Sequence, residues 1–184
     1  MKKVILASRS PRREELLGRI LEDFEIEESG IDEASGETDP DKLAGTLAER
    51  KAADVFSRNR DAVVIGADTV VAADGKLLGK PRDESEARKM IALLAGRTHS
   101  VHTGVCVAAE GFIKIICCKT LVSFDKMSQM DIDDYISAGD YKDKAGAYGI
   151  QGAAAKYITG ICGDYYNVVG LPVHALYKIL KEIL

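Results

Sequence analysis

The sequence has no tryptophan, only four phenylalanines and no excess of positive charge over its 184 residues. Its formal net charge is −4, from 25 Lys and Arg against 29 Asp and Glu. A surface built to hold nucleic acid needs a basic face and stacking aromatic side chains. The composition therefore argues against nucleic-acid binding, and it leaves room for a local basic pocket that holds a small polyanion.

Long hydrophobic runs are also missing. No stretch approaches the roughly 18 consecutive apolar residues that a membrane-spanning helix needs. The start of the chain, Met-Lys-Lys followed by a short apolar run, is too short for a signal peptide. We therefore expect a cytoplasmic protein without membrane association.

Side chains that commonly bind transition metals are few and show no metal-binding spacing. His99 and His102 are three residues apart on a predicted strand, so they point to opposite faces and are not expected to share a ligand. The four cysteines contain no C-x-x-C pair and fit no zinc template. In a cytosolic protein they are expected to be reduced and buried thiols; they are Cys106, Cys117, Cys118 and Cys162.

Strand and helix patterns alternate along the chain, with no repeat or proline-rich linker. Strands are predicted at 4–7, 24–28, 62–78, 100–108 and 112–124, with a strand pair around Gly163. The stretch 62–78 is expected to be interrupted at Gly66 and to turn at Asp74-Gly75. Helices are expected to begin at Ser10-Pro11, Asp39-Pro40, Asp83, Ser128 and Pro172. These elements predict one α/β domain over residues 1–184, a mixed twisted sheet flanked by helices with two lobes around a central cleft.

Two arginines lie in the first turn of the first predicted helix, where the helix dipole disfavours cations. Without an anion, Arg12 and Arg13 each cost about 0.3–1 kcal/mol at this position. The Ser8 and Ser10 hydroxyls, the free backbone N–H groups and the two guanidiniums together suit a phosphate group. The alternative is that both arginines are solvated and pair with the two glutamates that follow them.

Asp68 is a second charge in an unusual place, because it follows the apolar run 63–67 and precedes two valines. A carboxylate at the end of a buried strand is costly unless something pairs with it, and a divalent metal or a catalytic water is a suitable partner. The alternative is an Asp that caps a turn. Glu28, Asp32 or Glu33 can join Asp68 at a metal, and the spacing does not decide between them.

Lysines flank this aspartate in the sequence. Lys51 lies near the same helix stripe as two apolar residues, and Lys80 follows an apolar strand. Either lysine alone is more often a surface residue whose stem packs on the protein. Together with the arginines, they place several cations around one aspartate in an acidic chain.

The stretch DKAGAYGIQG, residues 143–152, is rich in glycine. Its glycines allow a ligand to approach the backbone closely. Lys144 adds a cation for substrate binding, and the amide of Gln151 suits the edge of a nucleobase. The stretch is not a P-loop, since it lacks the Walker A pattern, and the alternative is an ordinary turn.

Six stretches extend over nearly the whole chain: SRSPRREELL, GADTVV, LGKP, GRTHSVHTGV, DKAGAYGIQG and GDYYNVVGLP. Together and in this order they resemble the Maf family of nucleoside triphosphate pyrophosphatases, relatives of the enzymes that clear inosine triphosphate. The resemblance implies a mixed α/β fold with a central cleft, and hydrolysis of nucleoside triphosphates to monophosphate and pyrophosphate. It also implies a divalent cation, Mg²⁺ or Mn²⁺, and a homodimer.

The resemblance further implies roles for individual residues. Asp68 matches the family's proposed catalytic base, and Glu33 matches its acidic residue near the metal, so these two are the expected metal ligands. Lys51 and Lys80 match its cleft lysines and complete the catalytic set. The substrate-binding set adds Ser8, Arg12 and Arg13 at the phosphates; Arg12, Thr69 and Gln151 resemble the positions that mark the subfamily acting on dTTP and UTP.

One departure from the family pattern is Leu121, where many relatives have an acidic residue after the threonine. It leaves open whether metal or dimer contacts differ. A second hypothesis of a different class is a non-catalytic nucleotide-sensing regulator, because members of this family have been linked to arrest of cell division. Retention of Asp68 and of the clustered cations favours the enzyme.

Overall fold

A computed structural model describes residues 2–184. Its strands are β1 (Val4–Leu6), β2 (Glu25–Ile26), β3 (Val63–Ala73), β4 (Lys76–Leu78), β5 (Thr98–Ala109), β6 (Phe112–Phe124) and β7 (Ile158–Cys162). Its α-helices are α1 (Pro11–Leu17), α2 (Pro40–Arg58), α3 (Glu84–Leu94), α4 (Gln129–Ser137), α5 (Tyr165–Val169) and α6 (Val173–Ile183), with 3₁₀ turns at Ala145–Ala147 and Ala153–Tyr157. The predicted α/β class is confirmed.

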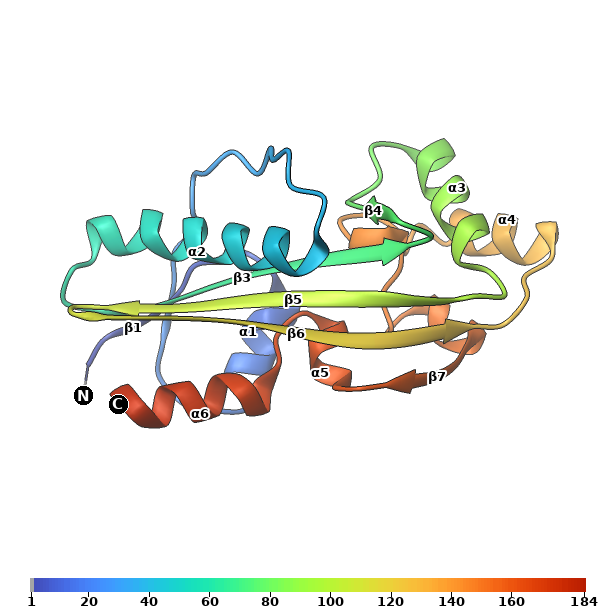
Figure 1. Cartoon of the computed structure of the whole chain (residues 1–184). Coiled ribbons are helices and arrows are strands. Elements are labelled where there is room, and N and C mark those ends of the chain that lie inside the picture. Colours follow the sequence, from blue (N-terminus) through green and yellow to red (C-terminus); the bar gives the residue numbers. More distant parts are fainter. Residues whose placement is uncertain (1) are drawn as a thin grey trace.

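The strands form one seven-stranded mixed sheet in the order β2-β1-β3-β5-β6-β7, with β4 beside β3. β1 is parallel to β2 and β3, and the other pairs are antiparallel. Two long strands, β5 and β6, form a hairpin that runs the length of the molecule (Figure 1). The prediction of a sheet that is not purely parallel is therefore confirmed.

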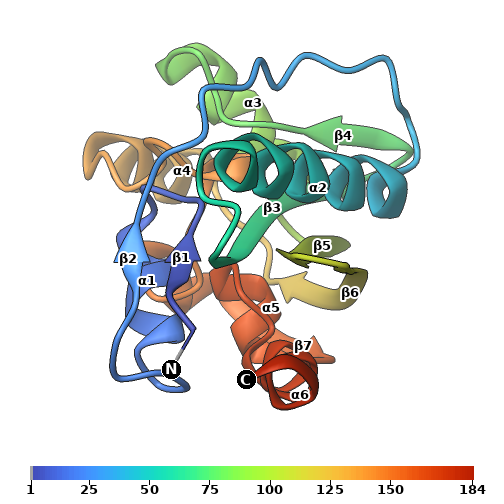
Figure 2. The same cartoon turned by 90° about the vertical axis from the view of Figure 1, so that its left-hand side faces the viewer.

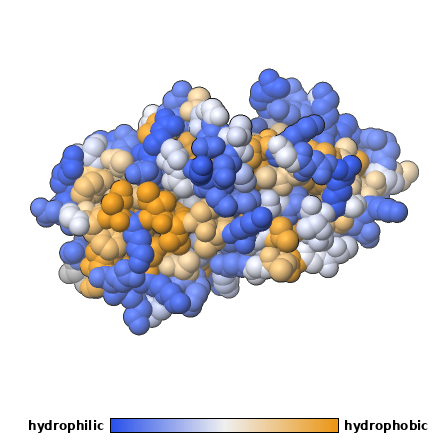
Figure 3. Space-filling view, in the orientation of Figure 1, coloured by the Kyte–Doolittle hydropathy of each residue, from blue (hydrophilic) through white to orange (hydrophobic). Residues whose placement is uncertain are grey.

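Helices cover both faces of this sheet (Figures 1 and 2). α2 lies on one face and buries Ala48, Ala52 and Val55 against β1 and β3. α1 and α6 lie on the other face, where Leu16 and Leu176 join the core. α3 and α4 form a second lobe around β4 and the far ends of β5 and β6, with a core of its own. Figure 3 shows a notch between the α2 half and the α3 half of the molecule.

One edge of β3 is left open between two short neighbours. β1 pairs with Val63–Ile65, and β4 pairs along the same edge with Val71–Ala73. β5 occupies the opposite edge throughout. Because no strand covers residues 66–70 on the open side, the sheet itself creates a gap between the two lobes.

α2 approaches the sheet closely because two strand positions carry no side chain. A Cβ at Gly66 would lie 2.2 Å from the carbonyl oxygen of Ala48, and one at Gly104 would lie 2.2 Å from that of Ala44. The prediction that Gly66 interrupts its strand is wrong, because β3 continues through it. The glycine is needed for helix packing, not for a break in the ladder.

Helix starts agree with the sequence. Asp39 accepts hydrogen bonds from the backbone of α2, Asp83 caps α3, and Ser128 forms a capping box with Asp131 at α4. The strand pair predicted around Gly163 is half wrong: β7 precedes that glycine, but α5 follows it, begun by Asp164. Among residues 2–184, no helix has both the length and the apolar composition that crossing a bilayer requires.

Candidate active site

A cleft of about 850 Å³ lies over the open stretch of β3, between the two lobes. Its volume falls within the range typical of small-molecule sites. Its walls come from the β1–α1 junction, the loop before α2, β3, the end of β4 and residues 140–152. All ten residues predicted for the site line it: Ser8, Arg12, Arg13, Glu33, Lys51, Asp68, Thr69, Lys80, Lys144 and Gln151.

Asp68 lies in the middle of β3, not at the end of a strand as the sequence suggested. The valines that follow it continue the same strand, so the alternative of a turn-capping aspartate is also wrong. What ends near Asp68 is its neighbour β1, whose pairing stops at Ile65. The carboxylate therefore faces the cleft from a rigid strand while its backbone stays in the ladder with β5.

Lys51 joins the two predicted metal ligands. Its ammonium lies 2.6 Å from Oδ1 of Asp68 and 2.6 Å from Oε1 of Glu33. Lys51 is only 9% exposed and Asp68 8% exposed, so the surface alternative for this lysine is wrong. Of the three acidic residues that the sequence left open, Glu33 is the one paired with Lys51 beside Asp68; Glu28 instead pairs with Arg9.

The ion pair keeps Glu33 ionised. Partial burial alone would raise the pKa of Glu33, but the hydrogen bond and charge of Lys51 outweigh it and hold that pKa below its usual range. Lys80, which lines the cleft from an exposed position, adds to the same effect. Within the described residues, Asp68 Oδ2 accepts no hydrogen bond, so this oxygen is available to a ligand or a water.

Arg13 is held on three sides by the protein. Its Nε donates to the carbonyl of Gly170 at 2.9 Å, and its terminal nitrogens donate to Ser8 Oγ at 3.3 Å and Thr69 Oγ1 at 3.0 Å. Burial lowers the pKa of this guanidinium, and the charge of Asp68 opposes that shift. The contacts fix the guanidinium plane at the base of the cleft.

Arg12 differs from Arg13, although the two are neighbours. It lines the cleft and forms neither a hydrogen bond nor an ion pair with any residue from 2 to 184. The alternative that both arginines pair with the following glutamates is wrong, since Glu15 pairs with Arg19 at 3.0 Å. Arg12 is thus the cation at this helix start that stays free to meet an anion.

The contacts around Thr69 were not foreseen from the sequence. Its hydroxyl lies 3.0 Å from that of Thr103, which in turn donates to the carbonyl of Asn167 at 2.9 Å. Asn167 and Gly170 belong to the α5 region, so the chain of hydrogen bonds ties α5, β5 and β3 to Arg13. No local spacing signals a network whose members lie on different elements.

The glycine-rich stretch is shaped by contacts with the protein itself. A Cβ at Gly146 would meet Val71, and one at Gly152 would meet the carboxylate of Asp140. Asp140 also pairs with Lys144 at 3.1 Å. Lys144 therefore reaches the cleft with its charge already partnered, while Gln151 is exposed at the cleft wall.

Leu121 lies on β6, is 39% exposed and does not line the cleft. The departure from the family pattern at this position is therefore away from the residues that gather around Asp68.

Comparisons with known proteins give matches over nearly the whole chain. A family model described as Maf-like protein matches residues 3–183. A dTTP/UTP pyrophosphatase of Bacillus cereus (strain ATCC 10987 / NRS 248) is 44% identical over 183 residues, covering 99% of this chain and 90% of the relative. Proteins of the same name from Thermococcus onnurineus and Pyrococcus abyssi are 47% and 45% identical, covering 98% and 97% of this chain and 97% and 95% of the relatives.

Proposed function

This chain belongs to the Maf-like protein family, and from that membership we propose that it hydrolyses dTTP and UTP to nucleoside monophosphate and pyrophosphate. Its relatives named dTTP/UTP pyrophosphatase match it over nearly their whole length. The observation that carries the proposal is the cleft itself, where a strand-borne carboxylate faces cations in a chain of net charge −4. A polyphosphate is the ligand that such a charge arrangement suits.

The triphosphate binds among the cations of the cleft. Arg12 and Lys80, which line the cleft, meet phosphate oxygens directly. Arg13 presents a guanidinium already oriented by Ser8 and Thr69. Because these groups are in place before substrate arrives, little reorganisation is needed when charge develops on the phosphates.

Asp68 is the catalytic base of the proposed reaction. A water attacks the α-phosphorus and loses its proton to Asp68 Oδ2, the oxygen that Lys51 does not occupy. The bond from the α-phosphorus to the oxygen that bridges to the β-phosphorus breaks, and pyrophosphate leaves with the bonding electrons. Lys51 binds the other carboxylate oxygen, Oδ1, and so holds the Asp68 side chain in place for this transfer.

Asp68 and Glu33 are the residues that would hold a divalent cation. Both carboxylates line the cleft, and Asp68 Oδ2 accepts no hydrogen bond from Lys51. Carboxylate oxygens suit Mg²⁺ or Mn²⁺, which take oxygen ligands and complete their shell with water and substrate phosphates. When bound, the cation supplies neutralisation of the phosphate charge. Glu33 suits this role because its pKa lies below its usual range, so the carboxylate is ionised at neutral pH.

Gln151 recognises the nucleobase of the substrate in this proposal. The Thr69 hydroxyl is already engaged by Arg13 and Thr103, so Thr69 acts as a positioning residue for the phosphate side. Gln151 is exposed at the cleft wall, and its amide both donates and accepts, as the edge of a pyrimidine requires. A pocket sized for a pyrimidine also rejects purines sterically, and modified pyrimidine nucleotides are further candidate substrates.

The experiment is pyrophosphate release from the full chain, measured with a panel of nucleoside triphosphates, with and without Mg²⁺ and Mn²⁺. We expect dTTP and UTP to be cleaved at least about tenfold faster than ATP and GTP, with one monophosphate formed per pyrophosphate. Nucleotide binding without pyrophosphate release would favour the alternative, a non-catalytic nucleotide-sensing regulator of cell division.

We also propose a cytoplasmic homodimer. β7 pairs only with residues 121–124 of β6, so the outer edge of β6, opposite β5, has no partner strand from the described residues over most of its length. Ile113 and Ile115 are two residues apart on this stretch, so their side chains share one face of the sheet. They are 60% and 42% exposed. Figure 3 shows hydrophobic side chains gathered over the same end of the sheet. Exposed apolar strand residues suit contact with a second copy, and light scattering of the purified chain tests the state.

A further inference from the structure

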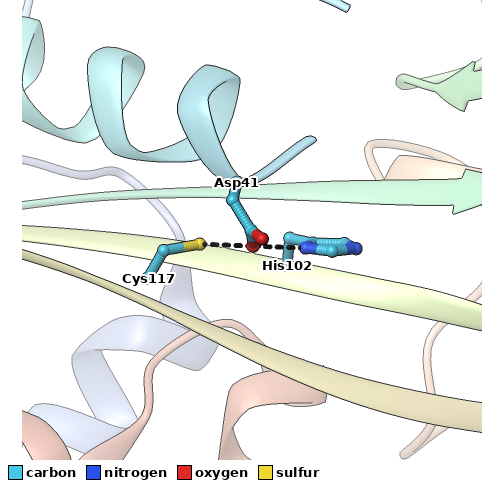
Figure 4. A group of neighbouring side chains, drawn as sticks. All are labelled: Asp41, His102 and Cys117. Carbon is cyan, nitrogen blue, oxygen red and sulfur yellow. Dashed lines mark hydrogen bonds and ion pairs between the residues drawn. The ribbon is translucent and has the colours of Figure 1, made fainter. Parts of the chain in front are cut away.

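Three side chains that can bind a transition metal meet on the α2 face of the sheet, outside the cleft (Figure 4). Asp41 Oδ1 lies 2.6 Å from Nδ1 of His102 and accepts a hydrogen bond from Sγ of Cys117 at 3.2 Å. The ligand atoms all lie within 4.8 Å of one another. We propose that Asp41, His102 and Cys117 form a zinc-binding site that is separate from the Mg²⁺ or Mn²⁺ site of the cleft.

The fold brings these residues together from three elements. On the β5–β6 ladder, His102 pairs with Lys119 and Cys117 pairs with Gly104, so His102 and Cys117 are diagonal neighbours on one face. Gly104, the strand partner of Cys117, has no side chain and lets α2 rest directly on the sheet at Ala44. Because of that close approach, Asp41 at the start of α2 lies between the imidazole of His102 and the thiol of Cys117.

The Ser100 hydroxyl orients the His102 ring on the side away from Asp41. Its oxygen lies 2.8 Å from Nε2 of His102 and 3.4 Å from the carbonyl oxygen of Ala72. A neutral imidazole with its proton on Nε2 donates a hydrogen bond to Ser100 and presents the Nδ1 lone pair toward the Asp41 carboxylate. In that tautomer a metal ion between Nδ1 and the carboxylate is bound by both atoms.

The donor set selects zinc over the hard cations. One sulfur, one imidazole nitrogen and one carboxylate oxygen suit Zn²⁺, whereas Mg²⁺ and Mn²⁺ prefer oxygen ligands. Tetrahedral Zn²⁺ places neighbouring ligand atoms about 3.3–3.6 Å apart. The Asp41–His102 distance of 2.6 Å has to open by less than about 1 Å to reach this spacing, and the Asp41–Cys117 distance of 3.2 Å is already close to it. The Nε2 hydrogen bond to Ser100 supplies the outer contact that orients a metal-bound histidine.

Solvent can reach the site and complete the coordination. His102 is buried, but the Asp41 side chain is 55% exposed and Cys117 is exposed. The prediction that the cysteines are buried is therefore wrong for Cys117 and Cys162, although it is confirmed for Cys106. Three protein ligands leave the fourth tetrahedral position to water. Binding displaces the Cys117 thiol proton, and an ion here would tie the start of α2 to both β5 and β6.

The test titrates the full chain, stripped with a chelator and kept reduced with a phosphine, first with Co²⁺ and then with Zn²⁺. We expect one Co²⁺ per chain with a sulfur-to-cobalt charge-transfer band, displaced by Zn²⁺ but not by a large excess of Mg²⁺ or Mn²⁺. Cys117→Ser should abolish the band. Cys162→Ser, which alters another exposed cysteine, should leave it unchanged.

Two more variants test the outer contact of the site and its independence from the cleft. Ser100→Ala should weaken Zn²⁺ binding by about 10–100-fold, as loss of an outer-shell contact does. Asp68→Asn should leave both the band and the Zn²⁺ affinity unchanged, because Asp68 belongs to the cleft. The proposal is overturned if wild type shows no charge-transfer band, if the band survives in Cys117→Ser, or if Asp41→Asn binds Zn²⁺ as tightly as wild type.

Discussion

Lys51 Nζ lies 2.6 Å from a carboxylate oxygen of Asp68 and at the same distance from one of Glu33, so one cation holds both predicted metal ligands. The three groups come from α2, β3 and the loop before α2. α2 can place its lysine there because Gly66 lets the helix settle onto β3. The ion pair is thus a product of helix packing.

Replacing Lys51 by Met should damage both stability and activity. It leaves the buried carboxylate of Asp68 without its cation, and breaking a buried pair in this way costs about 3 kcal/mol. Urea unfolding should show that loss, and pyrophosphate release should fall at least about a hundredfold. Lys42→Met, an exposed lysine of the same helix, should change neither quantity; equal stability of both variants would refute the structural role.

Asp68→Asn should reduce turnover by several orders of magnitude while nucleotide binding stays measurable. The amide keeps the shape of the carboxylate but cannot accept the proton of the attacking water. Single-turnover assays with dTTP, together with calorimetric binding in Ca²⁺, separate the two effects. Wild-type turnover in this variant would remove Asp68 from its role as base.

Arg12 and Arg13 should respond differently to the same change. Arg13→Lys loses the fork that reaches Gly170, Ser8 and Thr69, so it should lower both the unfolding free energy, by about 1–2 kcal/mol, and kcat. Arg12→Lys should leave the unfolding free energy unchanged and mainly raise KM. Equal loss of stability in the two variants would mean that the inward contacts of Arg13 contribute nothing.

Gly66→Ala should destabilise the protein by about 2 kcal/mol or more, since the new methyl group would lie 2.2 Å from the carbonyl oxygen of Ala48. It should also lower activity, because α2 carries Lys51. Gly160→Ala is the matched control, as nothing lies within 4 Å of a Cβ built at that strand position. Denaturation midpoints for the two variants should differ clearly; a tolerated Gly66→Ala would contradict the packing described for α2.

His99 should make stability depend on pH between 5 and 7. Burial lowers its pKa to about 4, while the unfolded chain keeps a value near 6.5, so the unfolded state binds more protons in this window. Stability therefore falls as pH falls, by about 2 kcal/mol between pH 7 and pH 5 for a folded pKa of about 4. Urea unfolding of His99→Gln should lack this component, whereas His174→Gln, an exposed histidine, should retain it.

Local pattern was enough to predict most elements. Asp39, Asp83 and Ser128 begin helices as expected, because a capping side chain binds backbone groups only two or three residues away. The hairpin at Asp74-Gly75 follows from the positive φ angles of 48° and 71° that these residue types tolerate. The errors at Gly66 and Gly163 arose where distant segments decide the outcome, α2 at the first and Thr120 at the second.

The sequence by itself determined which residues are candidates for the site: an aspartate in an apolar strand, arginines at a helix start and lysines in otherwise apolar surroundings are costly unless they have partners. Only the tertiary structure decided which residues pair with them. Lys51 pairs with Asp68 and Glu33, Arg13 turns inward while Arg12 stays free, and Asp41 meets His102 and Cys117 across separations of 61 and 76 residues. Periodicity and capping report contacts within a few residues, whereas these pairings depend on strand register and on how closely α2 lies on the sheet.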